Sequence, residues 1–404
     1  MIEVSPNRAS STLDPASIHS RGGGVIVWIL LAAAVVAGGI SAAGWSADPR
    51  RFAFSYLTAL TFVISISVGA LAWLMILHVA GAVWSQAVRR LLENLTRPLA
   101  WNLLLFIPVA MNLNRLYVWT DLSRRRTDAE LMRKAIWLNT PMFEVRSVFY
   151  LVSWTIVAGL LWRGSMRQDA TGDWKLIGRM RRTSMWGLIL VGLTTSFFSF
   201  DWLMSLDPHW SSTMFGVYFW AGSLVGSLAV LILLALGLRA TGKLDGLVTI
   251  EHRHELGKLL IGFVIFWAYI AFCQYLLIWY ANFPEETRWY VIRRSGNWNT
   301  LSWSLLFGHF VTPFFLLLLR ANKRDPFWLG FIATLVLVFH YADLYWLVMP
   351  TLSPESFEPH WLDFSVAAAL ISLCCAIVAH AFRTRPPVPI GDSRLTESLA
   401  FENP

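Results

Sequence analysis

Charged side chains are scarce in this sequence. Aspartate, glutamate, lysine and arginine make up 14% of its 404 residues, whereas 56% of the residues are hydrophobic. A soluble globular chain carries about 25% charged residues. This deficit excludes an ordinary soluble enzyme, a disordered chain and a nucleic-acid-binding protein, and it indicates an integral membrane protein.

Cysteine is also rare, and the usual cofactor and catalytic motifs are missing. The three cysteines lie in apolar runs, with no C-x-x-C pair and no set of four. The chain therefore lacks the thiolates that hold an iron–sulfur cluster or attach a c-type haem. No Walker loop, G-x-S-x-G, H-E-x-x-H or zinc spacing occurs. We therefore expect neither a resident metal nor a covalent hydrolase.

What the sequence does contain is a succession of long apolar runs. A helix needs about 20 apolar residues to cross a membrane, whereas a barrel strand needs only about 9–11. Ten stretches are long enough for such helices: 25–44, 52–82, 99–118, 143–162, 185–206, 214–238, 257–282, 301–320, 327–349 and 361–382. The sequence therefore predicts an all-α integral membrane domain over 25–382, with mobile tails at 1–24 and 383–404.

Lysine and arginine are unequally distributed between the predicted loops. When the N-terminus is placed inside, most of the 33 basic residues fall on the inner side, as the positive-inside rule requires. Both termini are therefore expected in the cytoplasm. The exception is the loop between the third and fourth spans, where several basic residues lie between Arg115 and Arg146. We expect this outer loop to be structured and to contact a partner.

Ionisable residues inside the spans are costly and usually face the bundle interior. His309 lies near the middle of the eighth span, and Pro313 leaves the carbonyl of His309 without its usual helical donor. His340 and Asp343 are three residues apart, so they share one face of the ninth span. A carboxylate beside an imidazole can pass a proton. These three residues are candidates for a proton relay, although a hydrogen-bonded lock between helices explains them equally well.

A second polar set lies at the outer ends of the spans. Glu144 and Arg146 open the fourth span, and Asp201 lies near the end of the fifth. Acids at this level could exchange protons with a quinol head group. We take the three residues as candidates for the border of a quinol pocket or a proton exit. Asp363 opens the tenth span, where a carboxylate suits the positive end of a helix; a role as a cap or interface residue is the alternative for each.

Several long strings carry a family resemblance. They are RFAFSYLTALTFVISISVGALAWLMILHVAG from Arg51, WLNTPMFEVRSVFY from Trp137, FDWLMSLDPHWSSTMFGVYFWAG from Phe200, LGKLLIGFVIFWAYIAFCQYLLIWYANFPEET from Leu256 and HYADLYWLVMP from His340. The chain resembles the ten-span membrane subunits of the polysulfide-reductase (NrfD-like) family. Within that family it is most similar to the second such subunit of bacterial alternative complex III, a quinol:cytochrome c oxidoreductase.

The resemblance implies a fold and an assembly. Spans two to five and six to nine would form two four-helix bundles, with spans one and ten outside them. The partners would be multihaem cytochromes c, an iron–sulfur protein, a sister ten-span subunit and lipid, with a terminal oxidase as a further candidate. Quinol would be oxidised near the outer face of a bacterial inner membrane, and the haem c and iron–sulfur clusters would belong to the partners. The resemblance assigns no catalytic residue to this chain.

Two other functions remain compatible with the residues. Ten spans, midplane histidines and prolines within helices also suit a secondary transporter. A purely structural anchor is the second alternative, and in it every buried polar residue would belong to a closed pair. A transporter would purify alone, whereas a subunit of the oxidoreductase would co-purify with haem and iron–sulfur proteins.

Overall fold

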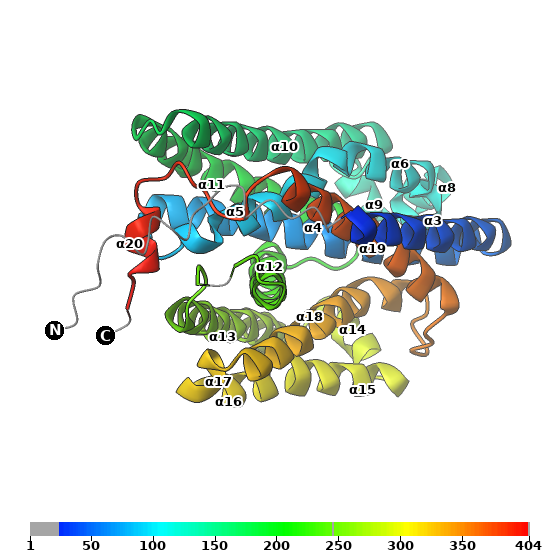
Figure 1. Cartoon of the computed structure of the whole chain (residues 1–404). Coiled ribbons are helices and arrows are strands. Elements are labelled where there is room, and N and C mark those ends of the chain that lie inside the picture. The colour runs from blue at the N-terminus through cyan, green and yellow to red at the C-terminus, as the bar shows by residue number, and fades with distance from the viewer. Residues whose placement is uncertain (1–23, 245, 403–404) are drawn as a thin grey trace.

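The structure, a computed structural model, describes residues 24–244 and 246–402, and these contain helices but no β-strand. Within these residues, nine helical segments are long and apolar enough to cross a membrane (Figure 1). They are α3 (Gly24–Ala47), α4 (Pro49–Ala80), α10 (Thr140–Thr171), α11 (Lys175–Trp202), α12 (Phe215–Ala240), α13 (Ile250–Ala281), α15 to α16 (Gly296–Leu318), α18 (Pro326–Val348) and α19 (Trp361–Thr384). The prediction of an all-α membrane protein is confirmed.

Short helices and turns connect these segments. They are α5 (Gln86–Leu95), η2 (Arg97–Trp101), α6 (Asn102–Met111), α7 (Leu113–Leu116), η3 (Val118–Thr120), α8 (Leu122–Thr127), α9 (Ala129–Arg133), η4 (Lys134–Ile136), η5 (Met204–Leu206), α14 (Pro284–Arg293), α17 (Arg320–Arg324), η7 (Met349–Thr351) and α20 (Leu395–Leu399).

The stretch expected as the third span is the main departure from the prediction. It is divided among η2, α6 and α7, and α6 has only 10 residues. The stretch nevertheless stays helical from Arg97 to Leu116 apart from Asn112. Pro108 removes a helical donor within α6, and the side chain of Asn112 bonds the carbonyl of Pro108 at 2.8 Å. Residues 99–118 are therefore divided among short helices and do not form one of the nine long apolar helices within the described residues.

Side-chain caps determine where several long helices begin. Asp48 accepts a hydrogen bond from the backbone of Arg51 at 2.9 Å before α4, and Asn139 does the same from Met142 at 3.0 Å before α10. In both helices a proline occupies the first turn, where its missing N–H costs nothing. These polar starts explain why each helix extends a few residues beyond its apolar run.

The long helices are arranged as two bundles and an outer pair (Figure 1). The first bundle contains α4, α6, α10 and α11, and the second contains α12, α13, α15 to α16 and α18. Helices α3 and α19 pack on each other outside them, as expected. The bundles meet along α4 and α12, where a Cβ on Gly69 would lie 2.1 Å from the carbonyl oxygen of Ser223. Glycine therefore allows the two backbones to touch.

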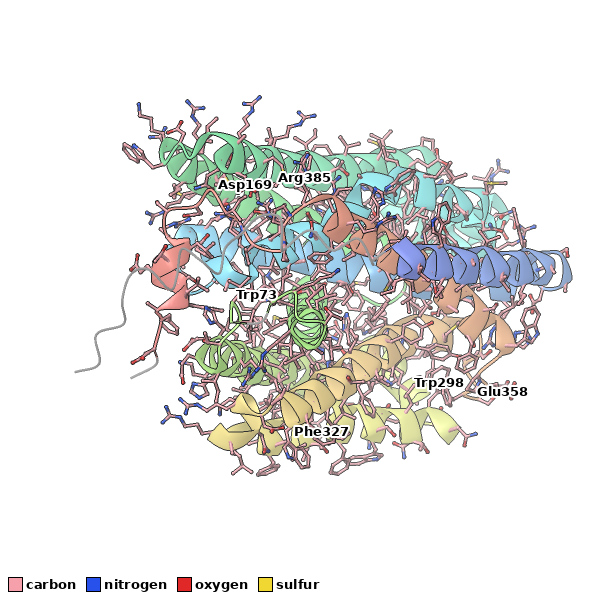
Figure 2. All side chains as sticks on the ribbon, viewed as in Figure 1. Trp73, Asp169, Trp298, Phe327, Glu358 and Arg385 are labelled. Atoms are coloured by element: carbon pink, nitrogen blue, oxygen red, sulfur yellow. The ribbon has the colours of Figure 1, made fainter. Side chains whose placement is uncertain are left out.

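The molecule has two distinct ends. We name as the loop end the side that carries α8, α9, α14 and residues 352–360, and as the tail end the side that carries α5, α17 and α20 (Figure 1). Trp298 and Glu358 lie toward the loop end, and Asp169 lies toward the tail end (Figure 2).

The C-terminal segment differs from the mobile tail that was expected. The buried carboxylate of Asp392 lies 2.5 Å from Arg89 of α5 and 2.9 Å from Arg394. The hydroxyl of Ser398 donates to the carbonyl of Trp84 at 2.7 Å. Burial alone would raise the pKa of Asp392, but its bond to Arg394 and the charge of Arg89 lower it to about 2. Ion pairs and buried contacts therefore attach residues 388–399 to the tail end.

Several tryptophans occupy the protein interior. Trp73, Trp154 and Trp202 are among the largest fully buried side chains. Each indole N–H has a partner: the carbonyl of Leu224 at 3.0 Å for Trp73, and hydroxyl groups for the other two. These rings fill helix interfaces while their one polar group remains bonded.

Candidate functional site

A closed ion pair lies at the loop end of the first bundle. Arg146 and Tyr150 are one turn apart on α10, and both reach Asp201 in the last turn of α11. Arg146 makes two bonds to the carboxylate, at 2.8 and 2.9 Å, and Tyr150 adds one at 2.8 Å. The indole of Trp137 supplies a fourth bond at 2.8 Å. Because both oxygens of the fully buried Asp201 are filled by protein donors, this arrangement is that of a structural pair.

Glu144 is not part of the Asp201 cluster. It lies on α10 two residues before Arg146, so the two side chains leave the helix in different directions. Glu144 is half-buried, and no hydrogen bond or ion pair involves it among residues 24–244 and 246–402. The structure therefore brings Arg146 and Asp201 together and leaves Glu144 apart.

The loop between α7 and α10 is folded. Asp128 caps α9 and also lies 2.6 Å from His209, which belongs to the turn after α11. Lys134 donates to the carbonyl of Pro208 at 2.5 Å. The hydrogen bond from His209 lowers the pKa of Asp128. The expectation of a structured loop is confirmed, and its contact with a partner stays a prediction.

The eighth span widens into a π-helical turn at His309. Residues Leu306–Val311 form this turn between α15 (Gly296–Leu305) and α16 (Thr312–Leu318), directly before Pro313. Pro313 cannot donate a backbone hydrogen bond, so a regular helix could not continue unchanged. The imidazole of His309 is fully buried, with its ring centroid 4.1 Å from that of Trp267 on α13.

His340 lies in a cradle formed by glycine residues. A Cβ on Gly226 of α12 would lie 2.5 Å from the imidazole, and a Cβ on Gly222 would lie 3.3 Å from it. These two glycines are four residues apart, which places them on one face of α12. The Nε2 of His340 is hydrogen-bonded to the hydroxyl of Ser65 on α4 at 2.8 Å. Small residues at the helix crossing thus admit a buried imidazole between the two bundles.

Asp343 is buried one turn nearer the loop end, but it does not bond His340. Its carboxylate accepts a hydrogen bond from the hydroxyl of Tyr218 on α12. The two residues share a helix face, yet His340 reaches α4 while Asp343 reaches α12. The direct imidazole–carboxylate contact that the spacing suggested is therefore absent from the described residues.

Two histidines of the second bundle have buried nitrogen atoms without a partner. Both ring nitrogens of His309 and the Nδ1 of His340 have no hydrogen-bond partner among the described residues. The rings of His309 and His340 have their centroids 6.3 Å apart. Buried polar groups in proteins nearly always have a partner. We refer to His309, His340, Trp267, Tyr218 and Asp343 as the open cluster.

Sequence reasoning missed several members of these sites. Ser65, Tyr218 and Trp267 carry no charge, so nothing in the hydropathy marked them. The four-residue spacing of Gly222 and Gly226 was a usable signal, because small residues at that spacing permit close helix contact.

Arg293 is a further residue that the sequence did not reveal. Its buried guanidinium donates to the carbonyls of Trp346 at 3.1 Å and Leu347 at 2.9 Å, near the end of α18. It also lies 3.3 Å from the ring centroid of Trp289. Burial lowers the pKa of Arg293 to about 9. The side chain fastens α14 to the carbonyl end of α18, where a cation is favoured.

Asp363 combines the expected cap with an ion pair. Its carboxylate accepts from the backbone of His360 at 2.9 Å, which closes the first turn of α19. It also lies 2.5 Å from Arg51 at the start of α4. The pair ties the outer helices to the first bundle at the loop end.

The comparisons with known proteins identify no relative. No protein-family model matches the sequence, and no curated protein matches it. Among the described residues, no group of three His, Cys, Asp or Glu side chains could hold a metal ion. The structure shows a multi-span helical membrane protein.

Proposed function

We propose that the chain is an integral membrane subunit of a quinol:electron-acceptor oxidoreductase of the alternative complex III type, and that its second bundle contributes a proton route. The observation that carries the proposal is the open cluster, in which His309 and His340 are buried near Asp343 with unpartnered ring nitrogens. The resembling strings support the assignment to a quinol-oxidising assembly.

The open cluster has the chemistry of a proton relay. Imidazole, hydroxyl and carboxyl groups can each donate and accept a proton. Ser65 bonds His340, the ring of His309 lies 6.3 Å from that of His340, and Tyr218 bonds Asp343 toward the loop end. Water molecules are the natural partners of the free nitrogens, because a polar site with several donors and acceptors holds them. A line of such groups would connect the membrane interior to the loop end.

In this proposal the quinol would bind at the loop end, next to Glu144, Arg146 and Asp201. The closed pair of Arg146 and Asp201 favours a structural role for these two residues, because their hydrogen-bonding atoms already have partners. Glu144 is the carboxylate of this layer that has no such partner among the described residues. Electrons would leave through an iron–sulfur protein and multihaem cytochromes c bound at the loop end. The tail end would face the cytoplasm of the bacterial cell.

Two observations bear on the alternatives. A purely structural anchor requires closed polar pairs, and the Asp201 cluster meets that requirement whereas the open cluster does not. A secondary transporter would also explain the buried histidines, but it would work without partner proteins. Affinity purification of the tagged chain from native membranes separates these functions, since haem and iron–sulfur proteins should co-purify with a subunit of the oxidoreductase.

The proton route is tested with the Asp343→Asn and His340→Ala variants in the assembled complex. Proton release per quinol oxidised is measured in vesicles with a pH-sensitive dye. We expect release through this route to fall by about 100-fold, the range that a positioned proton-transfer group supplies. Quinol oxidation itself should persist, because no reacting atom is placed on these side chains.

The Ser223→Ala variant is the matched control. Ser223 is also fully buried on α12, but its hydroxyl bonds the carbonyl of Phe219 in its own helix at 2.8 Å. Its removal should leave proton release unchanged. If the Asp343→Asn and His340→Ala complexes assemble and release protons at the wild-type ratio, the relay is wrong. Purification of the chain without any haem protein would overturn the oxidoreductase assignment.

A further inference from the structure

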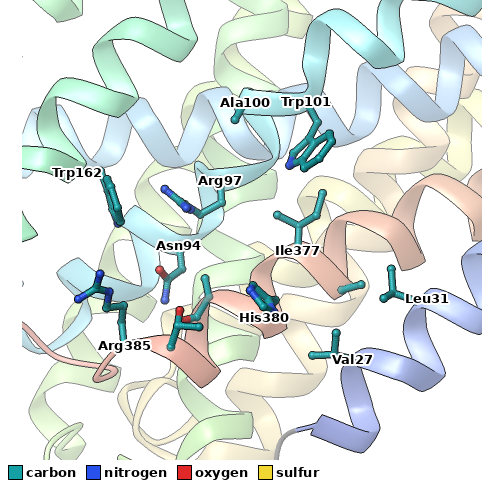
Figure 3. Close-up of a pocket in the computed structure, with 13 residues that line it drawn as sticks. Val27, Leu31, Asn94, Arg97, Ala100, Trp101, Trp162, Ile377, His380 and Arg385 are labelled. Carbon is teal, nitrogen blue, oxygen red and sulfur yellow. The ribbon is translucent and has the colours of Figure 1, made fainter.

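A large cavity opens beside α3 and α19, toward the tail end. It has a volume of about 540 Å³ and lies between α3, η2, α10 and α19 (Figure 3). Arg97, Arg385 and Trp162 lie on one side of it, whereas Val27 and Leu31 lie on the other. The cavity therefore has a basic part and an apolar part.

The basic part carries uncompensated positive charge. Among the described residues that line the cavity none is acidic, and neither Arg97 nor Arg385 forms an ion pair with a described residue. The guanidinium of Arg97 lies 4.4 Å from the ring centroid of Trp162, which holds it in place. Burial and the neighbouring Arg385 lower the pKa of Arg97. Two cations that face one cavity favour an anion between them.

Asn94 adds an independent observation. Its side chain lines the same cavity, it is 2% exposed, and its Nδ2 is without a hydrogen-bond partner among the described residues. A buried amide nitrogen needs an acceptor. Arginine and amide donors around one space are a suitable set for the oxygens of a phosphate group.

The apolar part continues as a groove along α3 and α19. A second hollow of about 350 Å³ shares Leu31 with the cavity and extends to Ser41 and Phe52. Its lining residues on α19 include Val366 and Leu370, and Ile377 continues the same helical stripe into the cavity. The groove therefore leads from the arginines toward the middle of the membrane-spanning helices.

We propose that this cavity binds an anionic phospholipid, with its phosphate at Arg97, Arg385 and Asn94 and an acyl chain along the groove between α3 and α19. Free phosphate would satisfy the donors but would leave the apolar groove unfilled. A neutral isoprenoid would fill the groove but would leave the two cations without a counter-charge. A lipid headgroup joined to an acyl chain matches both parts.

Lipid binding by the detergent-purified full-length protein, within its native assembly, tests this site. Headgroup-labelled phosphatidylglycerol is titrated into delipidated wild-type protein and into the Arg97→Gln/Arg385→Gln variant. We expect about 30-fold weaker binding by the variant, roughly fivefold for each basic residue. Arg179→Gln/Arg182→Gln is the matched control, because it removes the same charge from exposed positions on α11. The control should bind as the wild type does.

A variant of the apolar groove keeps the test decisive if the arginine variant folds poorly. Leu31→Trp narrows the groove and should weaken phosphatidylglycerol binding while Arg97 and Arg385 remain. Phosphatidylcholine should bind much more weakly than phosphatidylglycerol. Equal binding of the two lipids, equal binding by the arginine variant, or full competition by inorganic phosphate alone would each overturn the proposal.

Discussion

Asp201 in the first bundle and His309 in the second are both fully buried, yet their surroundings differ completely. Asp201 accepts four hydrogen bonds from three side chains. Neither ring nitrogen of His309 has a partner among the described residues, and its neighbours are aromatic rings. The contrast lies between these two residues and not between the whole bundles, because the first bundle also contains buried atoms without a partner, at His78 and Asn102.

The difference shows that polarity within a span has two uses. A saturated carboxylate locks helices together and has no capacity left for chemistry. An imidazole beside a π-turn, with both nitrogens free, can still donate or accept a proton. Burying its unpaired polar atoms lowers the stability of the folded protein. Partner geometry therefore separates saturated polar residues from those with unpartnered atoms where residue type does not.

The largest loss of stability is expected when the ion pair of the Asp201 cluster is removed. Arg146→Ala removes the cation that pairs with the buried Asp201 and should destabilise the protein by about 3–5 kcal/mol. Thermal unfolding of the detergent-purified protein measures this loss. Arg133→Ala is the control, because its pair with Glu130 is exposed and should contribute less than about 1 kcal/mol. Similar losses in the two variants would show that the Asp201 cluster is not a structural lock.

A smaller loss is expected when the cradle of the open cluster is filled. Gly226→Ala places a methyl group 2.5 Å from His340 and should cost about 1–3 kcal/mol through overpacking. It should also reduce proton release, because the imidazole must move. Gly237→Ala on the same helix meets nothing within 4 Å and should stabilise the protein by about 0.5–1 kcal/mol. Equal stability of the two variants would show that the close contact between Gly226 and His340 does not contribute to the free energy of unfolding.

Removal of the free imidazole should change stability least and function most. His309→Leu deletes two nitrogens that have no protein partner, so unfolding should shift by no more than about 1 kcal/mol. Proton release through the second bundle should nevertheless be lost. A destabilisation as large as that of Arg146→Ala would mean that His309 is part of a closed network.

The docking of the C-terminal segment should depend on pH, because it also involves a buried and saturated carboxylate, that of Asp392. The pKa of Asp392 is lowered from 3.8 to about 2, so its charged form stabilises the docked segment at neutral pH. This contribution should disappear as the pH falls from 3.8 through about 2. The protection of residues 388–399 against hydrogen exchange, taken relative to the intrinsic amide rate at each pH, should then fall in the wild type. In Asp392→Asn this protection should be low already and should not change across that window.

Sequence reasoning succeeded where chain length and residue type were sufficient. It predicted the helical membrane domain and the buried polar positions His309, His340 and Asp343, whereas the two bundles were implied by the family resemblance. It did not predict that 99–118 divides into η2, α6 and α7, because the length of an apolar run does not reveal the break at Asn112. It also failed to separate Glu144 from Asp201, because the direction of each side chain depends on the helix rotation.

The sequence by itself determined that the chain is an all-α membrane protein, because apolar runs of about 20 residues must satisfy their backbone groups as helices. It also limited the candidate chemistry to a few ionisable residues within the spans. Only the tertiary structure decided which of these are saturated, because partners for Asp201, His340 and Asp343 come from different helices. It likewise brought Arg97, Arg385 and Asn94 to one cavity, since positions far apart in the chain meet only after the helices pack.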